Sequence, residues 1–208
     1  MLDSRFSYGY SRINFWLSKV RKGCSLCILA IFVRFTTLIF FMAKKKNLSL
    51  VSIKEIPEMK DARVGIIVSE WNRDITDKLL EGCEQTLKKS GAKKKNIMQV
   101  NVPGSFELPS AAKILVEHKK LDAVICLGCI IQGETRHFEF ISNAVANGIA
   151  QLNINQYTPV IFGVLTTDSI EQAMNRAGGN HGNKGVEAAV TAIRMVTLQE
   201  EISPIFRK

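Results

Sequence analysis

Several common signatures of ligand binding and catalysis are absent from this sequence. It contains no Walker loop, no G-x-G-x-x-G fingerprint and no Ser–His–Asp order, which disfavours nucleoside triphosphate and dinucleotide chemistry. It has only three histidines and no Cys/His cluster, so a structural zinc ion would have no ligand set. We therefore expect a site that uses neither a metal nor another cofactor.

Cysteine is also sparse, and its five copies do not form a spaced disulfide framework. Cys83, Cys126 and Cys129 lie in apolar surroundings, which favours a reducing compartment, and we expect a cytoplasmic location. Cys126 and Cys129 match a C-x-x-C spacing, but no helix begins between them, as a thioredoxin-type motif requires. We interpret them as core thiols.

The formal net charge of +9 suggests nucleic-acid binding until the sequence is divided at Met42. Residues 1–41 carry six Arg or Lys side chains against one acid, so they account for +5 and the remainder for only +4. Much of that remainder lies in the lysine runs 44–46 and 93–95, which lack the interleaved aromatic or glycine residues of an RNA-stacking surface. We interpret both runs as solvated charge and expect no nucleic-acid partner.

The N-terminal segment permits three interpretations. Residues 26–42 are apolar except for Arg34 and two threonines, as in a short signal anchor or the apolar region of a signal peptide. Against both, an arginine near the middle of a membrane span costs about 2.5 kcal/mol or more, and no small-residue cleavage pattern follows. We favour a start site placed too far upstream, because Met42 opens a segment typical of a cytoplasmic start. Residues 1–41 are then a disordered or misassigned extension, residues 42–208 a single domain, and a membrane is not an expected partner.

From residue 63 onward, short apolar runs alternate with segments of helical periodicity, which predicts an α/β fold with a parallel sheet. The expected strands are residues 64–68, 97–102, 123–127 and 160–165. The expected helices are residues 74–90, 109–118, 138–155, 169–177 and 184–199, with a Gly-rich joint at 178–185. We expect a three-layer α-β-α sandwich, flavodoxin-like, with a four-stranded parallel sheet. Residues 43–60 form a polar arm whose 48–53 stretch resembles an edge strand, and we expect it to pair with a neighbouring subunit.

Right-handed crossovers bring the carboxyl ends of all four strands to one edge, where ligands bind in such folds. His137 opens the helix after the third strand, where the helix dipole favours a neutral imidazole that can accept a proton. A surface or capping histidine is the alternative. Glu107 starts a helix after a Pro-Gly turn, so its carboxylate either caps that helix or binds a ligand.

Cations and aromatic rings complete the candidates at this edge. Arg176 and Lys184 bracket the Gly-rich joint and would suit a phosphate ester, unless they are solvated charges at helix ends. Trp71, Phe106 and Phe162 stand at or near strand ends and could sandwich a flat heterocycle, although core packing is the commoner role of a residue like Phe162.

Four blocks of this sequence resemble the 6,7-dimethyl-8-ribityllumazine synthase family, in its order and at its spacing. The blocks are Trp71-Asn72, residues 102–109 (VPGSFELP), residues 127–137 (LGCIIQGETRH) and residues 176–185 (RAGGNHGNKG). The resemblance covers about residues 50–200. It departs from the common pattern at Trp71, where many members have Phe, and at Cys129, where Thr or Ala is frequent.

The resemblance implies a cofactor-independent transferase. Its reaction would condense 5-amino-6-(D-ribitylamino)uracil with 3,4-dihydroxy-2-butanone 4-phosphate to 6,7-dimethyl-8-ribityllumazine, phosphate and water, the penultimate step of riboflavin biosynthesis. The residues implied to bind the ribitylaminouracil are Trp71, Asn72, Ser105, Phe106, Glu107, Cys129, Ile130, Ile131 and Phe162. Those implied to bind the butanone phosphate are Glu134, Thr135, Arg176 and Lys184. His137 would move the protons.

The resemblance also implies a homo-oligomer, a pentamer or a sixty-subunit icosahedral shell, in which Phe162, Arg176 and Lys184 act on the site of an adjacent subunit. The compact joint at 178–185 favours the shell, and whether riboflavin synthase is enclosed as a partner stays open. Two other functions are kept as alternatives. One is a flavin- or pteridine-binding carrier with the same fold, and the other is a membrane-tethered interaction protein, which rests only on residues 26–42.

Overall fold

The computed structural model describes residues 56–202, so the predicted extension (1–41) and the predicted edge strand (48–53) lie outside the described residues. The sheet has four strands: β1 (Val64–Ser69), β2 (Ile97–Val102), β3 (Ala123–Ile131) and β4 (Val160–Thr167). All pairings are parallel, in the order β2-β1-β3-β4. The predicted parallel sheet is therefore confirmed, and its order, with β1 and β3 at the centre, is a new finding.

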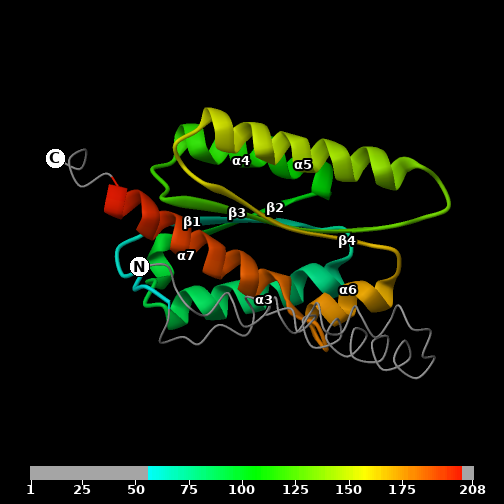
Figure 1. Cartoon of the computed structure of the whole chain (residues 1–208), viewed down its shortest axis with the longest axis horizontal. Coiled ribbons are helices and arrows are strands. Elements are labelled where there is room, and N and C mark those ends of the chain that lie inside the picture. Colours follow the sequence, from blue (N-terminus) through cyan, green and yellow to red (C-terminus); the bar gives the residue numbers. More distant parts are fainter. Residues whose placement is uncertain (1–55, 203–208) are drawn as a thin grey trace, which may run out of the picture. The chain divides into compact units, whose positions relative to one another are not determined.

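Within the described residues, five helices cover the sheet: α3 (Arg73–Lys89), α4 (Leu108–His118), α5 (His137–Asn155), α6 (Ile170–Arg176) and α7 (Lys184–Ile202). Figure 1 shows α4 and α5 on one face of the sheet and α3, α6 and α7 on the other. Two short 3-10 helices, η3 (Lys94–Asn96) and η4 (Ser105–Glu107), precede β2 and α4. The predicted three-layer sandwich is confirmed.

The nearly continuous apolar strands supply two separate cores. Successive strand side chains point to opposite faces of a sheet, so an unbroken apolar run is needed where helices cover both faces. In β1, Ile66 and Val68 pack in the core beneath α3 and α7, whereas Ile67 packs in the core beneath α4 and α5. Helix α3 ends as expected before Gly91, whose φ of 91° suits a residue without a side chain.

Two features differ from the sequence-based expectation: β3 and β4 are longer than predicted, and the Gly-rich joint contains strands. Strands β3 and β4 stay paired from Cys129 with Leu165 to Ile131 with Thr167, further than the apolar runs indicate. The Gly-rich joint contains a small antiparallel pair, β5 (Ala177–Gly179) and β6 (Gly182–Asn183). Glycine weakens the local strand pattern, yet a short hairpin forms here, with Ala177 opposite Asn183 and Gly179 opposite Gly182. Among residues 56–202, no helix combines the length and apolar character needed to cross a bilayer.

Candidate active site

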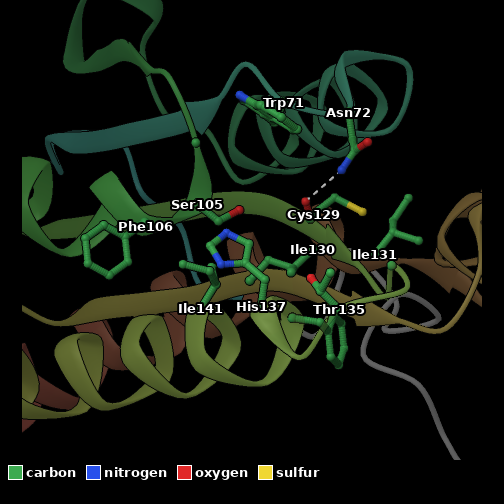
Figure 2. A pocket seen from close by; sticks show the side chains of 13 residues that line it. Trp71, Asn72, Ser105, Phe106, Cys129, Ile130, Ile131, Thr135, His137 and Ile141 are labelled. Carbon is green, nitrogen blue, oxygen red and sulfur yellow. Dashed lines mark hydrogen bonds between the residues drawn. The ribbon is translucent and has the colours of Figure 1, made fainter.

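A pocket of about 380 Å³ lies at the carboxyl edge of the sheet. Its walls come from the segments that follow β1, β2 and β3 and from the first turns of α5 (Figure 2). The lining residues are Trp71, Asn72, Gly104, Ser105, Phe106, Cys129, Ile130, Ile131, Gly133, Thr135, His137, Phe138 and Ile141. Three of the four strand ends therefore meet at one cavity, as the parallel topology predicts.

The turn after β1 places an aromatic ring at the pocket. The backbone N–H of Trp71 donates to the carbonyl oxygen of Pro103 at 3.2 Å, which ties this turn to the one after β2. The indole is 72% exposed, an unusual position for so large an apolar surface, and it is available to a flat ligand ring.

Asn72 has a left-handed backbone, with φ of 61° and ψ of 47°, and precedes α3. Asparagine tolerates this conformation better than most residues. Its side-chain Nδ2 donates to the carbonyl oxygen of Cys129 at 3.0 Å, as the dashed line in Figure 2 shows. This bond joins the start of α3 to β3 and holds one carbonyl of the pocket wall.

The turn after β2 carries three predicted site residues, and two of them line the pocket. Ser105 and Phe106 line the pocket, and the Phe106 ring is 56% exposed. Glu107 does not line it, because its Oε2 accepts a hydrogen bond from the backbone N–H of Gly104 at 2.9 Å. The structure thus gives Glu107 the capping role that the sequence left open.

His137 is the first residue of α5, one position earlier than the helix predicted over 138–155. Figure 2 shows its imidazole reaching from α5 into the pocket, on the side of Ser105 and Ile130. The neighbouring Arg136 does not line the pocket and pairs with Glu139 at 3.2 Å. The ionisable side chains among the lining residues are His137, which is exposed, and Cys129, which is buried. An exposed imidazole at a pocket wall can exchange protons with a bound ligand.

The turn before α5 is open to solvent. Gly133 and Thr135 line the pocket, whereas Glu134 is exposed and is not among the lining residues. A side chain added at Gly133 would meet nothing within 4 Å, so there is free space beside this turn. Backbone N–H groups at such a turn are suited to an anion.

Arg176, Lys184 and Glu187 form a separate group, which we term the ion cluster. Arg176 binds both carboxylate oxygens of Glu187, Nη1 to Oε1 at 2.8 Å and Nη2 to Oε2 at 3.0 Å, and Lys184 Nζ lies 3.4 Å from Oε2. Arg176 Nη1 also donates to the carbonyl oxygen of His181 at 2.6 Å. Neither cation lines the pocket of its own chain.

The ion cluster explains the titration of its carboxylate. Burial raises the pKa of Glu187, but the hydrogen bond and positive charge of Arg176, with the charge of Lys184, outweigh burial and leave the pKa below its ordinary value. Glu187 was not among the predicted site residues. The spacing of Lys184 and Glu187, three residues apart on one helix, was the available signal.

Phe162 also lies away from the pocket. It occupies the third position of β4, is partly buried and packs against the core beneath α4 and α5. Four lining residues were not predicted: Gly104, Gly133, Phe138 and Ile141. His137 and Ile141 are four residues apart and share one face of α5, so helical spacing alone would have indicated Ile141.

The thiols occupy the interior. Cys126 and Cys129 both lie in β3, with 0% and 2% of their surface exposed, in agreement with core positions. Burial raises the pKa of Cys126 to about 12 and that of Cys129 to about 11, so neither is a thiolate at neutral pH. Within residues 56–202 no group of His, Cys, Asp and Glu side chains could hold a metal ion.

Comparison with known proteins finds one family that matches most of this chain. The family model described as 6,7-dimethyl-8-ribityllumazine synthase matches residues 61–200. A protein of that name from Cytophaga hutchinsonii is 58% identical over 151 residues, which are 73% of this chain and 94% of the relative. The corresponding protein from Parabacteroides distasonis is 52% identical over 151 residues, 73% of this chain and 94% of the relative. One from Porphyromonas gingivalis is 50% identical over 153 residues, 74% of this chain and 95% of the relative.

Proposed function

Because this chain belongs to the 6,7-dimethyl-8-ribityllumazine synthase family, we propose that the pocket at the carboxyl edge of the sheet is its active site. The enzyme is a transferase that condenses 5-amino-6-(D-ribitylamino)uracil with 3,4-dihydroxy-2-butanone 4-phosphate. The products are 6,7-dimethyl-8-ribityllumazine, phosphate and water, in the penultimate step of riboflavin biosynthesis. Family membership, together with one pocket lined by an exposed indole, an exposed histidine and Ser105, carries this proposal.

The reaction requires the two substrates to be held side by side in a reactive orientation while protons are transferred. The amino group of the uracil forms an imine with the ketone, phosphate is eliminated, and the second ring closes with loss of water. Each of these steps transfers protons, and none needs a nucleophile from the protein. His137 is placed to accept and return the protons, since it projects into the pocket from the start of α5.

The ribitylaminouracil is assigned to the wall formed by the first two turns. Trp71 stacks on the pyrimidine, and its exposure leaves a face free for that contact. Asn72, Ser105, Phe106 and Glu107 surround the ring and the ribityl chain, with Glu107 acting through the Gly104 turn that it caps. The polar edges of the uracil meet backbone groups of Cys129, Ile130 and Ile131.

The phosphate is assigned to the open turn before α5. Backbone N–H groups of Glu134 and Thr135 bind its oxygens at the start of the helix, where the dipole favours an anion. Arg176 and Lys184 supply positive charge. Since neither lines the pocket of its own chain, we assign them, with Phe162, to the site of an adjacent subunit.

A shared site requires a homo-oligomer, which we propose to be a pentamer that assembles into a sixty-subunit shell. Light scattering or electron microscopy showing pentamers alone would contradict the shell. Mixing tests the shared site: the impaired His137→Ala and Arg176→Ala variants, unfolded and reassembled together, should regain part of the lost activity when the butanone phosphate is limiting. No recovery in co-assembled particles would contradict a site built from two subunits.

We also propose a cytoplasmic location and leave riboflavin synthase as a candidate partner inside the shell. Buried, unpaired Cys83, Cys126 and Cys129 suit a reducing compartment. Fractionation of the native organism tests the location, because sedimentation with membranes would instead support a tethered protein. Copurification of riboflavin synthase with intact particles tests the partner.

The direct test of the function is incubation of the purified protein with both substrates while the absorbance and fluorescence of the lumazine are followed. Product should appear only when both substrates and the protein are present, and phosphate should be released with it. Tight lumazine binding without turnover would overturn the enzymatic proposal and support the carrier alternative.

A further inference from the structure

Two buried hydroxyl groups meet beneath the pocket. Ser69 is the last residue of β1 and is 0% exposed, and Ser105 opens η4 and is 6% exposed. Neither Oγ atom has a hydrogen-bond partner within residues 56–202. Because buried hydroxyls are rarely left without a partner, this pair indicates a partner from outside the described fold.

Gly128 of β3 brings these hydroxyls to one place. A Cβ atom built on Gly128 would lie 2.6 Å from Ser105 Oγ and 3.3 Å from Ser69 Oγ. The nearest apolar atom, Leu108 Cδ1, would lie at 3.0 Å. Both hydroxyls therefore lie against Gly128, Ser69 at the end of the neighbouring strand β1 and Ser105 in η4, and a side chain at Gly128 would collide with them.

This spot lies between the core and the pocket. On the face toward α4 and α5, Ile67 of β1 and Cys126 of β3 belong to the apolar core. Two residues further along the same strands, Ser69 supplies a hydroxyl and Gly128 has no side chain, so the Ser105 hydroxyl packs against its backbone. Ser105 lines the pocket and Ser69 does not. A polar layer thus connects a fully buried group to the ligand cavity.

We propose that Ser69, Ser105 and Gly128 form a shared site for one neutral hydroxyl group beneath the pocket, through which Ser69 positions the Ser105 hydroxyl and the pocket wall that it belongs to. A water molecule or a hydroxyl of a polyol ligand supplies that group. Serine hydroxyls both donate and accept, so one O–H group can bond to the two oxygens at once. The set of lining residues contains no Lys or Arg to favour an anion instead.

This inference rests on the proposed function only for the identity of the polyol, the ribityl chain. Ser69→Ala is expected to raise KM for ribitylaminouracil about three- to tenfold while kcat changes by less than about threefold. Thr76→Val is the matched control, because Thr76 Oγ1 is also buried without a partner but does not line the pocket. An unchanged KM in a folded Ser69→Ala enzyme would overturn the positioning role.

High-resolution crystal structures of the wild-type protein, free and with 6,7-dimethyl-8-ribityllumazine, provide a second test. An oxygen atom within hydrogen-bond distance of both hydroxyls in the free protein identifies a water molecule as the source. An oxygen found there only in the complex, as part of the ribityl chain, identifies the ligand. Its absence from both structures overturns the shared site. The free-protein crystal needs no turnover, so this inference and the proposed function can fail independently.

Discussion

The pocket and the ion cluster satisfy their polar groups in opposite ways. In the pocket, Trp71 is 72% exposed, and Ser105 Oγ has no partner among the described residues. In the ion cluster, Arg176 and Lys184 are both bound to Glu187 of the same chain. Groups without an internal partner are available to a ligand, whereas paired charges are held in a fixed geometry. The two predicted halves of the site are therefore built differently, one to surround a flat ring and the other to present a fixed positive charge.

The largest expected effect tests whether the pocket carries the chemistry. We expect His137→Ala to lower kcat about ten- to a thousandfold, because a proton-transfer group is lost. The melting temperature should hardly change, since the side chain is exposed. Steady-state kinetics and thermal melts measure both, with His118→Ala, an exposed histidine at the end of α4, as the control. An unchanged kcat would remove His137 from the mechanism.

The next effect tests whether the ion cluster serves a ligand as well as the fold. Arg176→Ala is expected to raise KM for the butanone phosphate about ten- to a hundredfold, because a charge-assisted hydrogen bond to phosphate is lost. It should also lower the melting temperature, since Glu187 loses its bidentate partner.

Two variants control this measurement. Arg176→Lys keeps the charge without the bidentate geometry and should be intermediate in KM. Arg194→Ala removes an exposed arginine of α7 and should leave both quantities unchanged. If Arg176→Ala lowers stability with no change in KM, the arginine serves the fold alone.

A smaller effect sharpens the role of the exposed indole. Trp71→Ala is expected to raise KM for ribitylaminouracil about five- to fiftyfold through lost stacking, and Trp71→Phe should restore most of the affinity. Tyr157→Ala is a matched control, because Tyr157 is 71% exposed but lies outside the pocket. Equal effects at both positions would show that neither reports on ligand stacking.

The smallest effect concerns stability at acid pH. The folded-state pKa of Glu187 lies below its ordinary value of 4.5, so the ion cluster stabilises the fold above that pH and loses this contribution as the pH falls below it. Thermal melts should show wild-type stability decreasing below about pH 4.5 more steeply than that of Glu187→Gln. Parallel curves for the two proteins would contradict the assignment.

Much of the fold could be predicted because its signals are local. The apolar runs of β1 and β4 and the helical spacing of α3 are visible within short windows, and alternation of the two predicts a parallel sheet. The pocket followed from topology, because strand ends in such a sheet share an edge. Topology alone therefore predicts Trp71 and His137 at the edge where the pocket lies, and both line it.

Other features of the site depend on contacts that no short window contains. The sequence left capping and ligand binding open for Glu107, and only the structure shows that its carboxylate accepts from the Gly104 N–H. It treated Arg176 and Lys184 as candidates for a ligand, and the structure showed that a buried Glu187 already holds them. In both cases the choice depends on which partner the folded backbone brings within hydrogen-bond distance.

The sequence by itself determined the class of fold, the order of helices and strands and the family, because periodicity and motif spacing are properties of the chain alone. Only the tertiary structure decided the strand order, the extra length of β3 and β4, and the joining of Ser69 and Ser105 at Gly128. Ser69 and Gly128 are 59 positions apart, and they meet beside Ser105 of η4 only because β1 and β3 are neighbours in the sheet. Local pattern specifies which elements form, and packing between distant elements specifies what their ends can bind.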